Sequence, residues 1–164
     1  MRFFDCNAFF GLPAKRPLAP VADVAALLAE MDRAGLERAL VWHIAQHDVA
    51  PQTGNAMLAE AIAPYSRLYG CWTVLPNQAH EFPPPSLLFR QMREARVVGL
   101  RIFPSSHRYL ANAVSMGELF EAMVAARVPL FVSVHRGMAW RDVYDLLAEF
   151  PELTCVICDH GVWG

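Results

Sequence analysis

Charged residues are scarce in this sequence. Only 18% of its 164 residues are charged, against about 25% in an average soluble domain, and the formal net charge at pH 7 is −2. No segment is strongly basic, which argues against nucleic acid or anionic lipid as a partner. No run approaches the roughly 18 uncharged apolar residues that span a bilayer. We therefore expect neither a nucleic-acid-binding nor a membrane protein.

We also expect neither a secretion signal nor a disulfide framework. Asp5 stands where a signal peptide would have its apolar core, so we expect a cytoplasmic protein. The four cysteines lie in apolar stretches, which favours reduced, buried thiols over disulfides; they are Cys6, Cys71, Cys155 and Cys158. The Cys155-x-x-Cys158 pair lies on a predicted strand, where positions i and i+3 face opposite sides, which favours core packing over metal binding.

Apolar residues are abundant. They make up 55% of the chain, the mean hydropathy is +0.24, and this length is sufficient for one sizeable core. The apolar excess predicts that part of the surface is covered by something outside these 164 residues.

Short apolar runs typical of buried parallel strands alternate with helical patterns. Six strands are predicted, at residues 2–9, 38–45, 68–75, 97–103, 129–135 and 153–159. Five helices lie between them. We expect Ser115-x-x-Glu118 to open the fourth as a capping box. The fifth should bury an apolar stripe made of Trp140, Val143, Leu147 and Phe150.

This alternation predicts an α/β fold with a parallel sheet. Two architectures are compatible with it. A doubly wound sheet would be complete with six strands, whereas a (β/α)8 barrel of about 250 residues would be truncated at its C-terminus. A dinucleotide-binding sheet would have Gly-x-Gly-x-x-Gly after its first strand, but Phe9-Phe10-Gly11-Leu12-Pro13 stands there. We expect residues 1–164 to form a single, truncated barrel domain.

Function in parallel α/β folds lies at the carboxyl ends of the strands. The first four predicted strands place Asn7, His43 and Arg101 there. An arginine inside a buried strand needs a carboxylate partner, for which Asp5 is one candidate, or an anionic ligand.

His135 and His160 end the fifth and sixth predicted strands. Two histidines placed in this way could bind a divalent metal, but two ligands alone do not complete a site.

Six segments, in order, resemble the amidohydrolase-related family (the amidohydrolase superfamily) of metal-dependent hydrolases and decarboxylases. Phe4–Gly11 stands where the family has an opening Asp-x-His-x-His-x-Gly, and Val128–Gly137 resembles its fifth strand, which ends in a metal-binding His. The other segments are Gly54-Asn55 with Tyr65–Gly70, Val74–Pro76, Val98–Pro104, and Leu147–Leu153 continuing to Asp159-His160-Gly161.

This resemblance implies a TIM-like barrel with about six of its eight strands present. It also implies a divalent metal, usually zinc, that makes a bound water acidic. His135 and His160 would be catalytic residues and metal ligands, and Asn7, His43 and Arg101 would contact a small carboxylate-bearing or cyclic substrate.

The opening histidine pair is replaced by Asn7 and Phe9, and the aspartate that follows the family's eighth strand is not in the sequence. We therefore expect weak or absent zinc binding and little hydrolase activity. Three hypotheses stay open: a hydrolase or carbon–carbon lyase, an inactive small-molecule-binding pseudoenzyme, and a non-catalytic barrel fragment. For any of them, the strands beside the missing barrel units predict homo-oligomerisation or pairing through an open barrel edge.

Overall fold

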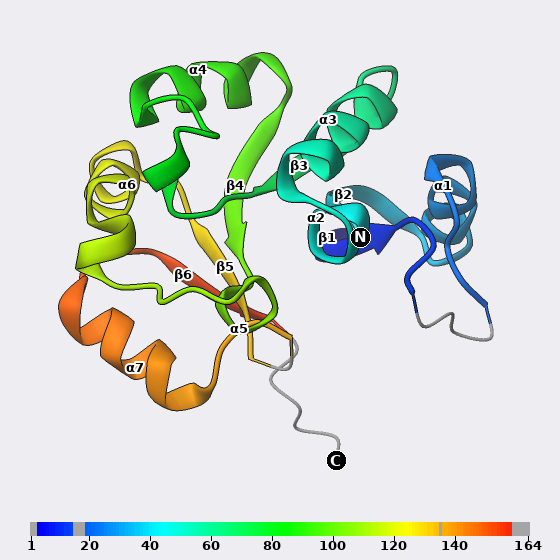
Figure 1. The fold of residues 1–164 in the computed structure, drawn as a ribbon. Helices are drawn as coiled ribbons and strands as arrows, with labels where there is room; N and C mark the ends of the chain where they lie inside the picture. The colour runs from blue at the N-terminus through cyan, green and yellow to red at the C-terminus, as the bar shows by residue number, and fades with distance from the viewer. Residues whose placement is uncertain (1–2, 15–18, 135, 159–164) are drawn as a thin grey trace. The chain divides into compact units, whose positions relative to one another are not determined.

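Figure 1 shows a computed structural model of the chain, which describes residues 3–14, 19–134 and 136–158. Contacts divide the chain into two compact units, residues 1–73 with 95–97 and residues 74–94 with 98–164. The strands follow one another in the sheet in chain order, β1-β2-β3-β4-β5-β6. A doubly wound sheet would reverse its strand order at a switch point, so this order selects the barrel-like alternative.

The first unit contains three parallel strands and three helices. Strand β2 pairs with both β1 and β3, and Phe10 at the end of β1 lies beside His43 at the end of β2. The elements are β1 (Phe3–Phe10), α1 (Val24–Arg33), β2 (Leu36–His43), α2 (Ala45–Asp48), α3 (Pro51–Ile62) and β3 (Leu68–Thr73). The β1–β2 register shifts between Phe3 and Phe4 and again between Asp5 and Ala8.

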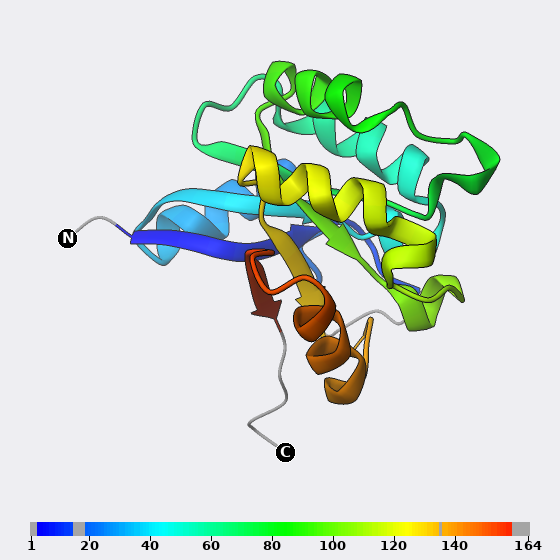
Figure 2. The ribbon, with the colours of Figure 1, turned by 90° about the vertical axis from the view of Figure 1, so that its left-hand side faces the viewer.

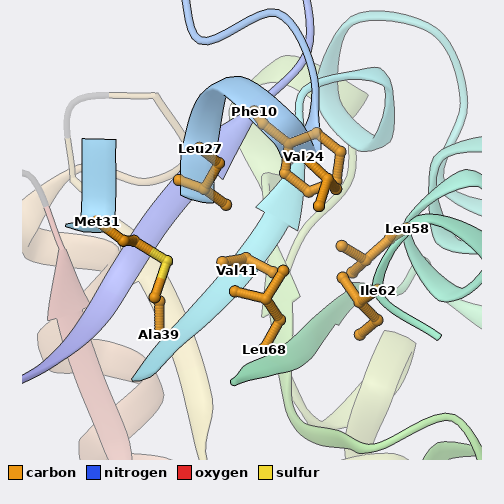
Figure 3. Packing of buried hydrophobic residues seen from close by; sticks show 9 residues of the cluster. All are labelled: Phe10, Val24, Leu27, Met31, Ala39, Val41, Leu58, Ile62 and Leu68. Atoms are coloured by element: carbon orange, nitrogen blue, oxygen red, sulfur yellow. The ribbon is translucent and has the colours of Figure 1, made fainter. Parts of the chain in front are cut away.

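The core of the first unit lies between this sheet and its helices (Figure 3). Helix α1 begins after Asp23, whose side chain accepts a hydrogen bond from Ala26 N, and its periodicity turns one apolar stripe toward the strands. Leu58 and Ile62 on α3 pack near Leu68 of β3. Burial of each such side chain stabilises the fold by about 1.5–3 kcal/mol, and the packed helices hold the strand ends in place.

The second unit has the same alternation. Strand β5 pairs in parallel with β4 and β6, and helices α4 and α6 lie side by side (Figure 2). The elements are η1 (Asn77–Ala79), α4 (Pro85–Glu94), β4 (Val97–Ile102), α5 (Pro104–His107), α6 (Ala113–Ala126), β5 (Leu130–Ser133), α7 (Trp140–Glu149) and β6 (Cys155–Cys158). Val97, the first residue of β4, belongs to the first unit.

All six predicted strands are present, and the α/β, partial TIM-barrel-like fold class is confirmed. The described residues contain seven α-helices instead of five. The two additional ones, α2 and α5, are single turns that directly follow the ends of β2 and β4. They are too short to give the hydrophobic periodicity by which a helix is recognised.

Two local predictions were wrong. Helix α6 is capped by Asn112, whose side chain accepts from Ser115 N while Ser115 Oγ accepts from Asn112 N, so Ser115 is the third helical residue and not the cap. In the predicted stripe of α7, Val143 is buried, but Leu146 is the other buried residue, Trp140 is exposed, and Leu147 and Phe150 are only half-buried.

The cysteines are free thiols, as expected, but they are not all buried. Cys71 and Cys158 are buried, Cys155 is half-buried and Cys6 is exposed on β1. In the part of the chain that the structure describes, no helix combines the length and apolar character needed to cross a bilayer.

Candidate functional site

His43 is the last residue of β2, where its side chain is only 9% exposed. Its Nδ1 accepts a hydrogen bond from Ala45 N at 3.1 Å, and the ring of Phe10 meets it edge-on at a centroid distance of 5.0 Å. Burial lowers the pKa of His43, because the protonated ring would lose its hydration. The sequence placed His43 correctly at a strand end, and the structure shows that its environment favours the neutral ring.

A buried amide network lies beside His43 and was not predicted. Gln46 Nε2 donates to Asn55 Oδ1 at 2.8 Å and to Cys71 O at 3.0 Å. Asn55 Nδ2 donates to Thr73 O at 2.8 Å, and Asn55 Oδ1 accepts from Thr73 N at 2.9 Å. These bonds tie α2 and α3 to the end of β3. The available signal was the Gly54-Asn55 pair in a predicted helix with an apolar stripe, since a buried amide is stable only if its hydrogen bonds are made.

Asn7 and Phe9 occupy the positions where the resemblance expects two histidines. Strand β1 continues to Phe10, so Asn7 lies within the strand and not at its carboxyl end, and its backbone N–H donates to Asp5 Oδ1 at 2.9 Å. The ring of Phe9 packs against that of Trp42 at a centroid distance of 5.2 Å. Phe9 therefore has a packing role in the first unit.

Arg101, the penultimate residue of β4, is 1% exposed. Its guanidinium lies 5.7 Å from the ring centroid of Phe131 and 5.9 Å from that of Phe103, within cation–π range. Its Nη2 is 3.9 Å from Cys158 Sγ. The sequence correctly identified a buried arginine here, and two aromatic rings and a thiol lie near its charge.

The environment of Cys155 disfavours zinc binding at the Cys155–Cys158 pair. Burial, and secondarily the charge of Cys158, raise the pKa of the Cys155 thiol to about 11. A thiol with this pKa stays protonated near neutral pH, whereas zinc binds the thiolate.

The turn that follows β5 is closely packed against the end of β4. A Cβ at Gly137 would lie 2.9 Å from Ser133 O and 3.1 Å from Ile102 O, so only glycine fits. Gly137 O accepts from Ser105 N at 2.8 Å, and Arg136 O accepts from Ser106 Oγ at 2.7 Å. The predicted site residues His135 and His160 lie outside the described residues.

A cavity of about 640 Å³ lies elsewhere in the second unit, between the segment after β3 and the first turns of α6. Its polar lining residues include Asn77, His80 and Glu118. Asn7, His43 and Arg101 are not among the residues that line it.

The described residues do not form a metal site. Across residues 3–14, 19–134 and 136–158, no group of three histidine, cysteine or acidic side chains is arranged to hold a metal ion. On β1, a phenyl ring stands at one expected ligand position and an amide, a weak zinc ligand, at the other. We therefore derive no catalytic step through a metal.

No family model matches the chain, and a search of the curated proteins gives no match. Solved structures do match. A probable 2-pyrone-4,6-dicarboxylic acid hydrolase from Acinetobacter baumannii, with citric acid bound, has a TM-score of 0.66 at 17% identity over 96% of this chain. A 5-carboxyvanillate decarboxylase from Novosphingobium aromaticivorans, complexed with manganese and 4-hydroxy-3-methoxy-5-nitrobenzoic acid, has a TM-score of 0.67 at 15% identity over 94% of the chain.

A dihydroorotase from Campylobacter jejuni is also similar, with a TM-score of 0.56 at 14% identity over 95% of this chain. The chain spans 58%, 64% and 46% of the lengths of these three proteins. The resemblance to amidohydrolase-superfamily proteins is thus confirmed for the fold. Identities this low do not carry over an activity.

Proposed function

We propose that this chain binds a small carboxylate-bearing molecule and that Arg101 supplies the positive charge that attracts it. The observation that carries this proposal is the burial of the Arg101 guanidinium near the carboxyl end of β4. Guanidinium matches a carboxylate in geometry, and burial strengthens the attraction between the two charges. Two structural neighbours contain ligands with carboxyl groups, citric acid and a substituted nitrobenzoic acid. Asn7 and His43 are our further proposed substrate contacts.

In the catalytic form of this proposal the chain is a metal-dependent hydrolase or decarboxylase. His135 and His160 would be its catalytic residues and its ligands for zinc, and the substrate would be a small carboxylate-bearing or cyclic compound. The manganese in the decarboxylase neighbour supports a divalent cation.

A second candidate is a binding protein without catalysis, and β1 favours it. Phe9 cannot ligate a metal and packs against Trp42, and an asparagine stands at the other expected ligand position. We expect little zinc after purification. Stoichiometric zinc that is lost in His135→Ala would contradict this expectation and favour the catalytic form.

We also propose a cytoplasmic protein that self-associates. The free cysteines fit a reducing compartment. Phe3 and Phe4 on β1 are 51% and 52% exposed, and an apolar surface of this kind favours association. Light scattering tests the association, and a monodisperse monomer would refute it.

Calorimetric titration with citrate tests the proposal on Arg101. In Arg101→Met the apolar volume is kept and the charge is lost, so we expect citrate affinity to fall at least about tenfold, the loss typical of a charge-assisted hydrogen bond. Arg101→Lys keeps the charge but not the fork geometry and should bind with intermediate affinity.

Arg93→Met on the exposed surface of α4 is the matched control and should bind citrate like the wild type. Unfolding curves show whether each variant is folded. A folded Arg101→Met variant with unchanged citrate affinity would refute the role of Arg101 in binding.

A further inference from the structure

The ring of His43 is held in one orientation. Gly11, which follows β1, has φ +106°, and a Cβ there would lie 3.1 Å from both Cε1 and Nε2 of His43. The imidazole therefore packs directly on a backbone without a side chain, while Phe10 meets its plane from the edge. Any larger residue at position 11 would collide with the ring, and with Ile44 at 2.6 Å.

The hydrogen bond at Nδ1 determines where the proton of the neutral ring lies. A backbone N–H can only donate, so Nδ1 of His43, 3.1 Å from Ala45 N, acts as the acceptor. In a neutral imidazole the other nitrogen then carries the proton. Burial of the ring opposes the addition of a second proton. That proton would bind Nδ1, and the hydrogen bond from Ala45 N–H would have to break.

The donor amide is itself fixed. The residue after Ala45 is Gln46, whose side chain is bonded to Asn55 and to the backbone of Cys71. From the other side, Gly54 approaches so closely that a Cβ there would lie 2.2 Å from Gln46 N. Gln46 and Asn55 are therefore positioning residues, because they hold the turn that presents Ala45 N–H to His43.

His47, four residues later, provides an internal reference. Its Nδ1 lies 2.6 Å from Asp48 Oδ1, and a carboxylate can only accept, so His47 carries a proton on Nδ1. The two histidines of one short segment should thus have opposite protonation at Nδ1.

We propose that His43 is a neutral hydrogen-bond donor that presents Nε2–H to an acceptor oxygen of the ligand, and that it is neither a general base nor a metal ligand. A general base or metal ligand would need an unprotonated Nε2. The single proton of the neutral ring would then lie on Nδ1, where the hydrogen bond from Ala45 N–H excludes it. The presence of a ligand oxygen rests on the proposed function, whereas the position of the proton does not.

Long-range ¹H–¹⁵N NMR of uniformly labelled protein tests the proton position without any ligand. At neutral pH we expect His43 Nδ1 to resonate in the unprotonated range and Nε2 in the protonated range, and His47 to have a protonated Nδ1. His43→Gln and His47→Gln assign the signals. A protonated Nδ1 at His43 would overturn the proposal.

Citrate is the probe for the ligand contact. Gln places an amide N–H near the position of Nε2–H, whereas Leu fills the same space without a donor. We expect His43→Gln to keep citrate affinity within about threefold and His43→Leu to lose about tenfold, as for one buried hydrogen bond. The His43 Nε2 resonance of the wild type should shift when citrate is added.

Equal citrate affinity in wild type and folded His43→Leu would overturn the ligand contact. If the wild type does not bind citrate, the function proposed around Arg101 fails, and the NMR measurement on the free chain still decides the proton position of His43.

Discussion

The two units place different chemistry at the carboxyl ends of their strands. In the first unit His43 ends β2, and the amides of Gln46 on α2 and Asn55 on α3 are bonded to the backbone at the end of β3. In the second unit the penultimate residue of β4 is the buried Arg101, whose guanidinium has two phenyl rings and the Cys158 thiol nearby. A neutral network can hold a shape by itself, whereas a buried guanidinium adds a positive charge that suits a carboxylate.

The largest effect should come from removing the amide of Asn55. In Asn55→Ala, Thr73 loses the partners of its backbone N–H and C=O, and Gln46 loses one of its two acceptors. Because these groups are buried, we expect the free energy of unfolding to fall by about 3 kcal/mol.

The matched asparagine in the second unit is Asn112, which caps α6 near the surface. Asn112→Ala should lower the free energy of unfolding by only about 1 kcal/mol, since water can replace the cap. Urea denaturation of both variants measures the difference. Equal losses would mean that the network in the first unit is no more than a set of solvated hydrogen bonds.

A smaller effect is expected from a single methyl group at a glycine. In Gly54→Ala the new Cβ would lie 2.2–2.6 Å from backbone atoms of Gln46, which cannot move without displacing α2. Overpacking of this kind should lower the free energy of unfolding by about 2 kcal/mol.

Gly117 in the second unit is the control, since its added Cβ would meet nothing closer than 3.7 Å. Gly117→Ala should raise the free energy of unfolding by about 0.5–1 kcal/mol, because alanine loses less backbone entropy in a helix. Thermal unfolding measures both effects. If Gly54→Ala and Gly117→Ala change the free energy of unfolding in the same direction, the expected contrast between the two glycines is wrong.

The smallest expected effect is the pH dependence of stability that arises from His43. Burial lowers the pKa of His43 in the folded state below its ordinary value of 6.5, so the unfolded chain takes up the proton first. The stability from the neutral ring is complete above pH 6.5 and is lost as the pH falls below it. Melting temperatures of wild type and His43→Gln should diverge below pH 6.5, and parallel curves would contradict this assignment.

Periodicity predicted the strands and their parallel order, because buried strands are continuous apolar runs and each is followed by a helix. It failed at short elements, where α2 and α5 have too few residues to form a pattern. It also predicted that Arg101 and His43 lie near strand ends. The network of Gln46, Asn55 and Thr73 could not be predicted, since its members are up to 27 positions apart and meet only through packing.

The orientation of Asn7 could not be predicted from residue spacing either. Spacing predicts which residues share a face only in a regular strand, and the register of β1 against β2 is irregular.

The two register shifts in β1 affect how this segment can be aligned with other proteins. From Phe3 to Ala8 the chain advances five residues, and so does its partner from Leu36 to Val41, but Phe4 and Asp5 lie one step out of phase between these points. Side chains on the two sides of such an irregularity exchange faces. An ungapped comparison from Asp5 through Phe9 therefore crosses one of these irregularities, and a structural superposition of β1 should precede any substitution meant to restore a histidine pair.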